Sequence, residues 1–275
     1  MTSGRKGEVT DTTMTGHAGA LHVRTWRHAD PTHIVVLAHG YGEHIGRYDH
    51  VAAALGARGA AVYGLDHAGH GRSEGERALL ADFDRVVADL HALAETARRE
   101  LPGLPAVLVG HSMGGLIATR YAQRHGGELA GVVLSAPLVG SHDSTGLLAA
   151  DPLPEVPIDP AVLSRDEATG RAYAEDPLVY HGGFKRPTLV AMARAMLDAA
   201  LDSPRVTGPV LWQHGEADEL VPIAGTRRLI DLLVNAEVTV RTYPGARHEI
   251  FNETNRDEVL ADTARFVDAV AAGRS

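Results

Sequence analysis

The stretch Gly110-His-Ser-Met-Gly114 decides the fold of this 275-residue chain. A short, wholly apolar run at residues 106–110 leads into it, and a segment with helical spacing follows at residues 113–125. Such a run is typical of a strand that is buried on both faces of a parallel sheet. The flanking glycines allow a sharp strand-to-helix turn that would hold the Ser112 hydroxyl exposed, and the helix N-terminus would direct backbone N–H groups at the same point. The sequence therefore predicts a nucleophilic serine beside a site for a developing oxyanion.

Apolar runs of strand length alternate with amphipathic segments of helix length on both sides of this turn. That alternation predicts an α/β fold with a mostly parallel central sheet flanked by helices. We expect strands at residues 21–26, 34–38, 61–66, 106–110, 132–135, 210–214 and 238–243. We expect helices at residues 48–58, 83–100, 113–125, 187–201, 223–234 and 257–271. Residues 1–20 lack the apolar block of a secretory signal, and we expect them to form a frayed leader.

The alternation breaks between residues 137 and 185, where Ser, Asp, Gly and four closely spaced prolines replace it. A long stretch of this kind inside a compact domain is usually a functional lid or disordered. We therefore predict a core in two parts, residues 1–137 and 186–275, with a short inserted cap at residues 138–185. Four apolar side chains of the cap are candidates for a substrate entrance or for a small core of the cap itself: Leu147, Leu148, Leu153 and Val156.

Composition excludes several classes of partner. The formal net charge of −9 and the absence of a dense Lys/Arg run argue against nucleic acid. The chain has no cysteine and hence no disulfide or thiolate nucleophile, which fits a cytoplasmic protein. No run of about 18 apolar residues could span a bilayer, so any membrane association would be peripheral, through the cap. These features leave the oligomeric state open.

A serine hydroxyl is a weak nucleophile and needs a base that a third group orients. In sheet enzymes with this serine turn, an acid and then a histidine follow the serine, each after a late strand. Asp218 follows the last strand but one, and His248 follows the last. Glu216 and Glu219 are alternatives for the acid because they lie within three positions. We predict Ser112, Asp218 and His248 as a catalytic triad.

The loop His39-Gly-Tyr-Gly-Glu-His44 follows the predicted strand at residues 34–38. One backbone N–H of this loop and one from the residue after the nucleophile should form the oxyanion hole. We predict that these donors are the amides of Tyr41 and Met113. We expect His39 and His111 to lie beneath the site as hydrogen-bonded groups. The residues predicted around the substrate are His39, Gly40, Glu43, His111, Leu138, Leu147, Leu148 and Leu178.

The chain has 16 histidines, which raises the question of a metal site. His39 and His44, or His67 and His70, have spacings that occur in such sites. No H-E-x-x-H motif is present, and no second cluster supplies the remaining ligands. No glycine-rich phosphate-binding motif indicates a nucleotide either. We therefore expect neither a metal nor a cofactor.

Four blocks of the sequence resemble signatures of the monoacylglycerol lipases, a family of serine hydrolases with the α/β-hydrolase fold. They are His39-Gly-Tyr-Gly-Glu-His44 with Arg47-Tyr48, Asp66-His-Ala-Gly-His-Gly-Arg-Ser-Glu-Gly75, Gly110-His-Ser-Met-Gly-Gly115, and the segments of Asp218 and His248. The resemblance covers most of the chain, and the segment from Tyr243 to Glu253 is similar to bacterial, actinobacterial-type members. It implies cleavage of medium- and long-chain monoacylglycerols to glycerol and fatty acid, with a mobile cap that touches lipid surfaces. Asp176-Pro177-Leu178 resembles the segment where that cap rejoins the core.

Other functions remain open at this point. A short cap suits a broad carboxylesterase that acts on short-chain, aryl or phthalate esters. A serine aminopeptidase would need an acidic patch for the amino group of its substrate, for which Glu43 is an ambiguous candidate. Haloalkane dehalogenases and epoxide hydrolases are disfavoured because their nucleophile is an aspartate. A non-catalytic binding protein of the same fold is disfavoured because all three triad residues are present.

Overall fold

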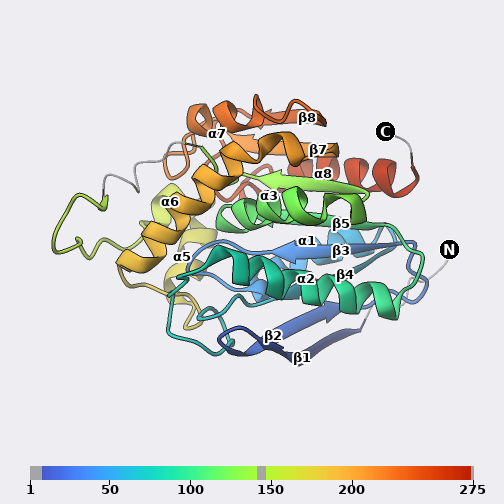
Figure 1. Cartoon of the computed structure of the whole chain (residues 1–275), viewed down its shortest axis with the longest axis horizontal. Helices are drawn as coiled ribbons and strands as arrows, with labels where there is room; N and C mark the ends of the chain where they lie inside the picture. Colours follow the sequence, from blue (N-terminus) through green and yellow to red (C-terminus); the bar gives the residue numbers. More distant parts are fainter. Residues whose placement is uncertain (1–7, 141–146, 274–275) are drawn as a thin grey trace.

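The computed structural model describes residues 8–140 and 147–273. Its centre is one eight-stranded sheet with the strand order β1-β2-β4-β3-β5-β6-β7-β8. The first two strands pair antiparallel, β2 also runs antiparallel to β4, and all later neighbours are parallel. The strands are β1 (Val9–Gly16), β2 (Gly19–Trp26), β3 (His33–Ala38), β4 (Ala60–Leu65), β5 (Ala106–His111), β6 (Gly131–Ser135), β7 (Gly208–Gly215) and β8 (Ala236–Tyr243). The predicted mostly parallel sheet is confirmed (Figure 1).

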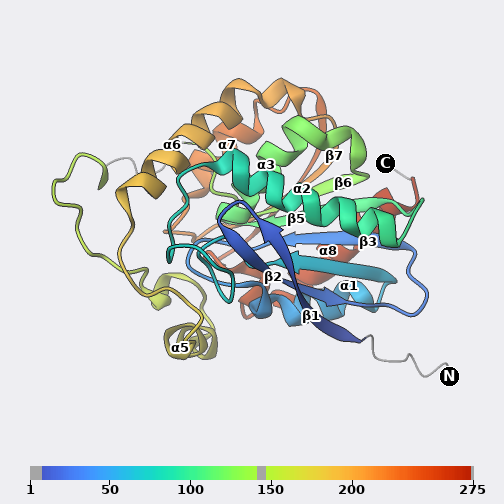
Figure 2. The same cartoon turned by 60° about the horizontal axis from the view of Figure 1, so that its bottom comes forward.

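Helices cover both faces of the sheet (Figures 1 and 2). They are α1 (Asp49–Gly56), α2 (Phe83–Glu100), α3 (Met113–His125), α5 (Glu167–Glu175), α6 (Arg186–Leu201), α7 (Ile223–Ile230) and α8 (Arg256–Ala271). Short 3-10 turns are η1 (Ile45–Tyr48), η2 (Gly126–Glu128), η3 (Pro160–Val162), η4 (Ser203–Arg205) and η5 (Ile250–Asn252). Side chains of α2, α3, α6 and α7 fill the core on one face, and those of α1 and α8 fill it on the other. Among the described residues, no helix is both long and apolar enough to cross a membrane.

Strand β5 shows why its sequence carries no polar side chain until His111. Ala106 and Leu108 pack into the core on the α2 and α3 side, while Val107 and Val109 pack into the core on the α1 and α8 side. Successive side chains of a strand point to opposite faces, so a strand covered on both faces must be apolar throughout. The rigid centre of the sheet therefore positions the serine turn at its end.

The prediction of a frayed leader over residues 1–20 is wrong for the part that the structure describes. Val9–Gly16 forms the edge strand β1, in register with β2 from Val9 opposite Trp26 to Gly16 opposite Gly19. The strand is half-buried or exposed along its whole length and carries Thr and Asp. An edge strand with so little buried surface has no apolar alternation to reveal it. Residues 1–7 lie outside the described part.

Two predicted helices are shorter than expected. The helix expected at residues 48–58 runs only over Asp49–Gly56 after the η1 turn, because Gly59 with φ +95° turns the chain into β4. The helix expected at residues 223–234 ends at Ile230. The remaining helices begin and end close to their predicted bounds, so sequence periodicity located the core elements well.

The predicted cap contains the turn η3 and the helix α5, joined by extended segments. Leu163, Tyr173 and Val179 form a small core of their own beside the main one. Residues 147–157 extend away from the sheet layers in both views (Figures 1 and 2). Tyr180 N donates a 2.7 Å hydrogen bond to Gly42 O, which attaches the cap to the loop after β3. Residues 141–146 lie outside the described part, and the cap boundaries remain a prediction.

Candidate active site

Ser112 occupies a strained turn between β5 and α3. Its backbone has φ 54° and ψ −119°, a conformation that a non-glycine residue adopts only when its surroundings impose it. Ser112 N donates to Ser135 O at 2.9 Å, and Ser112 O accepts from Leu138 N at 2.9 Å. The end of β6 therefore holds the turn from one side, while α3 begins directly after it on the other.

The two glycines of the turn are required by close backbone packing. A Cβ atom at Gly110 would lie 2.2 Å from Gly114 O. A Cβ atom at Gly114 would lie 2.0 Å from Ala38 O at the end of β3. Since real Cβ contacts are never that short, any side chain here would push α3 away from β3. The G-x-S-x-G pattern thus sets the distance between the serine and the loop that follows β3.

His248 and Asp218 form a buried pair beside the serine turn. His248 Nδ1 lies 2.8 Å from Asp218 Oδ2, and Asp218 Oδ1 accepts from the backbone amides of Leu220 and Val221 at 3.0 and 2.8 Å. His214 Nε2 lies 3.2 Å from Asp218 Oδ2 as well. Four donors thus surround this carboxylate, so it is held as an ionised acceptor.

Opposite pKa shifts follow from this contact. Burial alone would raise the pKa of Asp218, but the charge of His248 and the hydrogen bonds from both histidines lower it well below its ordinary value. Burial alone would lower the pKa of His248, but the Asp218 carboxylate raises it above its ordinary value. Asp218 occupies Nδ1, so Nε2 is the ring nitrogen left to exchange a proton with the serine.

Two backbone amides are available as oxyanion donors. Met113 is the first residue of α3, and the first N–H groups of a helix have no partner within it. Tyr41 lies in the loop after β3, between Gly40 and Gly42. Among the described residues, neither amide donates a hydrogen bond outside the helices and strands. Both can therefore point a free N–H at a bound carbonyl oxygen.

Glu43 fixes the loop that carries Tyr41. The side chain is 4% exposed and accepts three hydrogen bonds of 2.6 Å, from Gly40 N, the Tyr48 hydroxyl and Arg47 Nη1. A buried carboxylate with this many donors is stable only in one arrangement. Glu43 thereby orients the peptide directly before the Tyr41 amide.

Arg47 connects this loop to the histidine segment. Its guanidinium donates two 2.7 Å hydrogen bonds to Glu249, the residue after His248. Its Cζ atom lies 5.1 Å from the centroid of the Tyr173 ring in the cap. Burial alone would raise the pKa of Glu249, but Arg47 lowers it, so the carboxylate is charged. The network joins the oxyanion loop, the base segment and the cap.

A pocket of about 560 Å³ of atom-free space opens above Ser112. Its predicted lining residues Gly40, Glu43, His111 and Leu138 are present, together with Tyr41, Ser112 and His248. Sequence reasoning missed the other lining residues: Ile158, Leu163, Tyr173, Phe184, Met192, Leu220, Val221 and Glu249. Only Glu249, Leu220 and Val221 had a signal, because they adjoin His248 and Asp218. The walls are mainly apolar and come from the cap and α6 as well as the core.

Three predicted substrate contacts need correction. Leu147, Leu148 and Leu178 do not line this pocket; the Leu148 and Leu178 carbonyls accept hydrogen bonds from Arg186 and Arg77. Residues 147–157 extend away from the sheet layers (Figures 1 and 2), so Leu147 and Leu148 do not reach the pocket although they belong to the predicted cap.

His39 lies beneath the site, where a hydrogen-bonded group is predicted. It does not line the pocket, although it is also predicted as a substrate contact. The ring is fully buried, accepts from His67 N at Nε2 and contacts Gly40 O through Nδ1 at 2.8 Å. His111 does line the pocket, with Nδ1 3.1 Å from Ser135 O and its ring centroid 4.9 Å from that of His248. Burial lowers the pKa of His111 to about 4, so the ring is neutral beside His248.

Comparison with known proteins gives consistent relatives. A family model described as serine aminopeptidase, S33, matches residues 29–255. A monoacylglycerol lipase of Mycolicibacterium smegmatis is 42% identical over 252 residues, which cover 86% of this chain and 89% of that protein. A monoglyceride lipase of Homo sapiens is 36% identical over 245 residues, covering 85% of this chain and 81% of that protein.

Among solved structures, the fold is similar to that of a Paleococcus ferrophilus monoacylglycerol lipase, with a TM-score of 0.78 and 28% identity. The match covers 96% of this chain and 99% of that one. The resemblance predicted from the sequence blocks is confirmed. The chain belongs to the serine aminopeptidase S33 family of α/β-hydrolases, together with these monoacylglycerol lipases.

Proposed function

We propose that the protein is a serine ester hydrolase that cleaves monoacylglycerols to glycerol and fatty acid through an acyl-enzyme. The observation that carries this proposal is the position of Ser112 on a strained turn, at the floor of an apolar pocket that the Asp218-paired His248 also lines. The names of the relatives support the substrate class.

The proposed reaction uses the chain's own groups. His248 removes the proton from Ser112 as its Oγ attacks the ester carbonyl, while Asp218 holds the imidazole in the required tautomer. The amides of Tyr41 and Met113 donate hydrogen bonds to the carbonyl oxygen and stabilise the negative charge that develops on it. The C–O bond then breaks, and the alcohol leaves with the proton from His248. A water activated by His248 attacks the acyl-enzyme and releases the acid and Ser112.

The lining of the pocket suits a substrate with one long apolar chain. Leu138, Ile158, Leu163 and Met192 offer an apolar wall for an acyl chain, while Glu43 and Glu249 place polar atoms at one side. Burial of an acyl chain contributes about 0.8 kcal/mol per CH₂ group, so longer chains should bind more tightly until the pocket is full. This gradient is what a test of the substrate class should measure.

The test is hydrolysis of a matched series of monoacylglycerols from short to long acyl chains, beside short aryl esters, phthalate esters and aminoacyl anilides. We expect the highest kcat/KM on medium- or long-chain monoacylglycerols. A Ser112→Ala variant with an unchanged unfolding midpoint should lose about 10³-fold or more of kcat.

Other outcomes have distinct meanings. A preference for short aryl or phthalate esters would keep the serine mechanism and replace the lipase by a general carboxylesterase. A preference for aminoacyl anilides would assign an aminopeptidase. Unchanged turnover in Ser112→Ala would overturn the mechanism, and absence of both turnover and labelling by a serine-directed phosphonate would indicate a binding protein.

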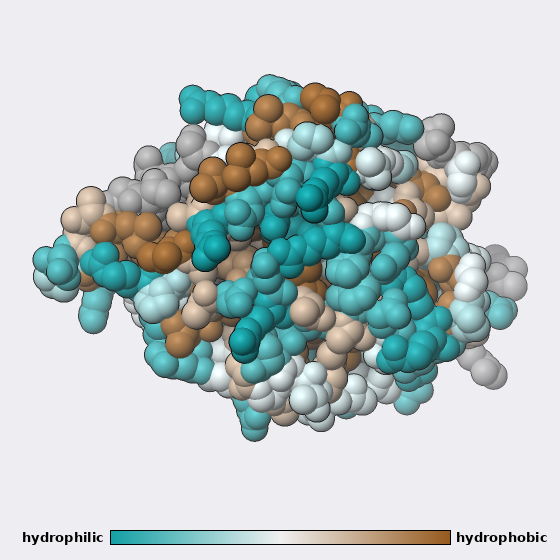
Figure 3. Space-filling view, in the orientation of Figure 1, coloured by the Kyte–Doolittle hydropathy of each residue, from teal (hydrophilic) through white to brown (hydrophobic). Residues whose placement is uncertain are grey.

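We also propose peripheral contact with lipid surfaces in a cytoplasmic setting. The outer face of α6 exposes Val190, Leu197 and Leu201, by 52%, 59% and 71%, and apolar surface is visible over this helix (Figure 3). These residues are seven and four positions apart, so they share one face of the helix. On the inner face of the same helix, Met192 lines the pocket. A lipid surface at α6 would therefore lie next to the substrate site.

Vesicle binding tests this contact. The double variant Leu197→Ser and Leu201→Ser should bind phosphatidylglycerol vesicles more weakly and lose activity on emulsified substrate, while its activity on a soluble short ester stays unchanged. The matched control is Val9→Ser, which removes an apolar side chain that is 51% exposed on the edge strand β1. Equal vesicle binding by the double variant and the control would contradict the proposal.

A further inference from the structure

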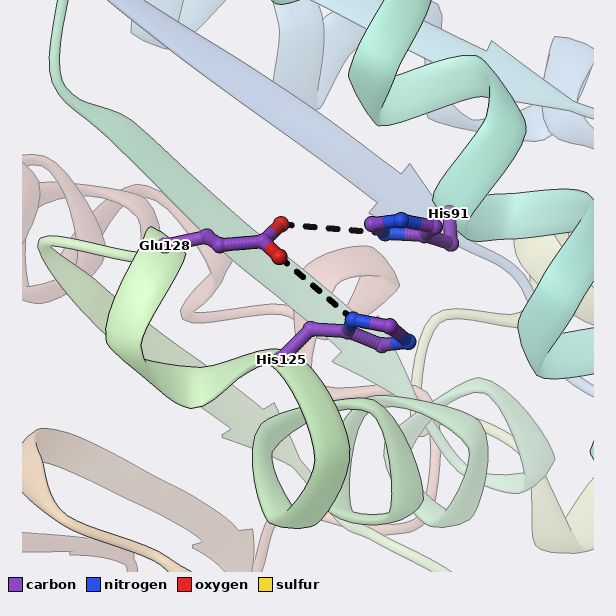
Figure 4. Close-up of side chains that lie close together, drawn as sticks. All are labelled: His91, His125 and Glu128. Carbon is purple, nitrogen blue, oxygen red and sulfur yellow. Dashed lines mark ion pairs between the residues drawn. The ribbon is translucent and has the colours of Figure 1, made fainter.

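A second cluster of titratable side chains lies away from the candidate active site. His91 of α2, His125 at the end of α3 and Glu128 of η2 converge on one surface (Figure 4). The 13-residue helix α3 runs from Met113, next to Ser112, to His125, and its two ends are about 18 Å apart. The cluster therefore has no part in the proposed ester chemistry.

The distances within the cluster approach those of ligands around a shared ion, with each histidine facing a different oxygen of Glu128. His125 Nδ1 lies 3.5 Å from Glu128 Oε1, and His91 Nδ1 lies 3.7 Å from Glu128 Oε2. These separations are too long for good hydrogen bonds. Two ligand atoms bound to one tetrahedral zinc ion at its usual bond lengths lie about 3.4 Å apart. One ligand atom from each of the three residues falls within 4.8 Å of the others, so small side-chain movements would complete the site.

The two imidazoles lie next to each other. Their rings stack with centroids 3.8 Å apart and planes 12° apart, an arrangement that two charged rings would oppose. Binding one ion through both rings requires them to tilt toward each other. Both side chains are about a quarter exposed, which leaves room for this tilt and for an ion to enter.

The surroundings orient the carboxylate and favour a cation. Arg98 Nη1 forms an ion pair with Glu128 Oε2 at 2.9 Å, while Oε1 lies 3.5 Å from His125. Such contacts behind a ligand fix its orientation in metal sites. Arg98 also pairs with Glu95 at 2.7 Å, so its own charge is balanced outside the cluster. The cluster lies at the C-terminal end of α3, where the helix dipole favours positive charge. The Tyr121 hydroxyl, 3.2 Å from His91 Nδ1, is the contact that an ion would displace.

We propose that His91, His125 and Glu128 form a binding site for a late first-row divalent metal ion, Zn²⁺ or Cu²⁺. Two imidazoles and one carboxylate suit these ions, whereas Mg²⁺ and Ca²⁺ require oxygen ligands. The site leaves a coordination position for water. A bound ion would fasten α2 to the end of α3 and stabilise the layer of helices that carries Ser112. This inference does not depend on the proposed ester hydrolysis.

Calorimetric titration of the untagged full chain with ZnCl₂, after removal of metal with EDTA, tests the site. We expect one tight equivalent of Zn²⁺ and no such binding of Mg²⁺ or Ca²⁺. At a free Zn²⁺ concentration a hundred times the Kd, the unfolding midpoint should rise by about 5 °C. His91→Ala and His125→Ala should each weaken the affinity at least tenfold, and Glu128→Gln, which keeps the side-chain shape, should weaken it as well.

The matched control is His28→Ala, which removes a half-buried histidine from the loop between β2 and β3. It should bind Zn²⁺ like the unaltered chain. Electron paramagnetic resonance with one equivalent of Cu²⁺ gives a readout independent of stability. Two bound imidazoles produce hyperfine splitting from two nitrogens, and either histidine variant should lose the contribution of one. Equal Zn²⁺ affinity in all variants, or no binding at millimolar Zn²⁺, would overturn the proposal.

Discussion

Glu43 joins two halves of the candidate site through one carboxylate. It accepts from the peptide before the Tyr41 amide, and through Arg47 it reaches Glu249 beside His248. A positioning residue of this kind affects the transition state more than ground-state binding, because it sets the geometry of the reacting groups. The residues of this network come from separate sequence motifs. Its role therefore follows only from the folded structure.

Glu43→Gln tests this positioning role. The amide keeps the shape and can still accept from Gly40 N, but it removes the charge that Arg47 balances. We expect kcat to fall by about tenfold or more with little change in KM, and stability to fall by about 2 kcal/mol. The control Glu237→Gln, on the exposed side of β8, should change neither. A rise in KM at unchanged kcat would instead indicate a role in binding the substrate.

The His248–Asp218 contact sets the pH dependence. His248 must be neutral to accept the Ser112 proton, so activity is lost as pH falls through its pKa. Because Asp218 raises this pKa above 6.5, kcat/KM on a soluble ester should reach half its maximum above pH 6.5. In Asp218→Asn the raising charge is gone, so the half-maximum should move to lower pH, while the rate falls about 10⁴-fold. The same half-maximum in both proteins would contradict the assignment of Asp218.

The order of strands along the chain was sufficient to predict the three triad residues. Ser112, Asp218 and His248 each follow a strand, and parallel strands bring their C-terminal ends to one edge of the sheet. The apolar walls of the pocket could not be predicted in this way. Tyr173 and Met192 reach it from the cap and from α6, and their positions depend on how these elements pack. Neither residue has a local pattern that distinguishes it from an ordinary core side chain.

At the scale of elements, sequence periodicity could not resolve the edge strand β1 or the inserted cap. Strand β1 buries little surface, so its sequence has no apolar face, although its Thr residues favour a strand. The cap packs around Leu163, Tyr173 and Val179, a core too small to impose a repeat on 48 predicted residues. The central strands and helices were predictable because each has a face that must be buried.

The junction of β5 with α3 yields a prediction about glycine. Gly114→Ala should destabilise the protein and abolish ester hydrolysis, because its Cβ would lie 2.0 Å from Ala38 O and displace α3 with the serine. Gly126→Ala, at the other end of the same helix, adds a Cβ with nothing within 4 Å and should be tolerated. Its change in stability should stay within about 1 kcal/mol. Urea unfolding and ester turnover of both variants measure this, and full activity in Gly114→Ala would refute the packing argument.

At the scale of the whole molecule, buried histidines link folding to pH. His39, His67, His70 and His111 are buried, and burial lowers the pKa of each, for His70 and His111 to about 4. In the unfolded chain such groups take up a proton near pH 6.5. Between pH 6.5 and 4 the unfolded state therefore binds more protons than the folded state, so stability falls as pH falls. The raised pKa of His248 acts in the opposite direction, but for one group against four.

We therefore expect the free energy of unfolding to decrease by several kcal/mol between pH 7 and pH 5, before the carboxylates begin to titrate. A histidine with a folded pKa of about 4 contributes about 2 kcal/mol of this loss. Urea unfolding at both pH values measures it, and His70→Gln should reduce the difference by about that amount, whatever its effect on stability at pH 7. His28→Gln, which removes a histidine from a surface loop, should leave the difference almost unchanged. An identical pH dependence in His70→Gln and the unaltered chain would show that the pKa of His70 is the same in the folded and the unfolded protein.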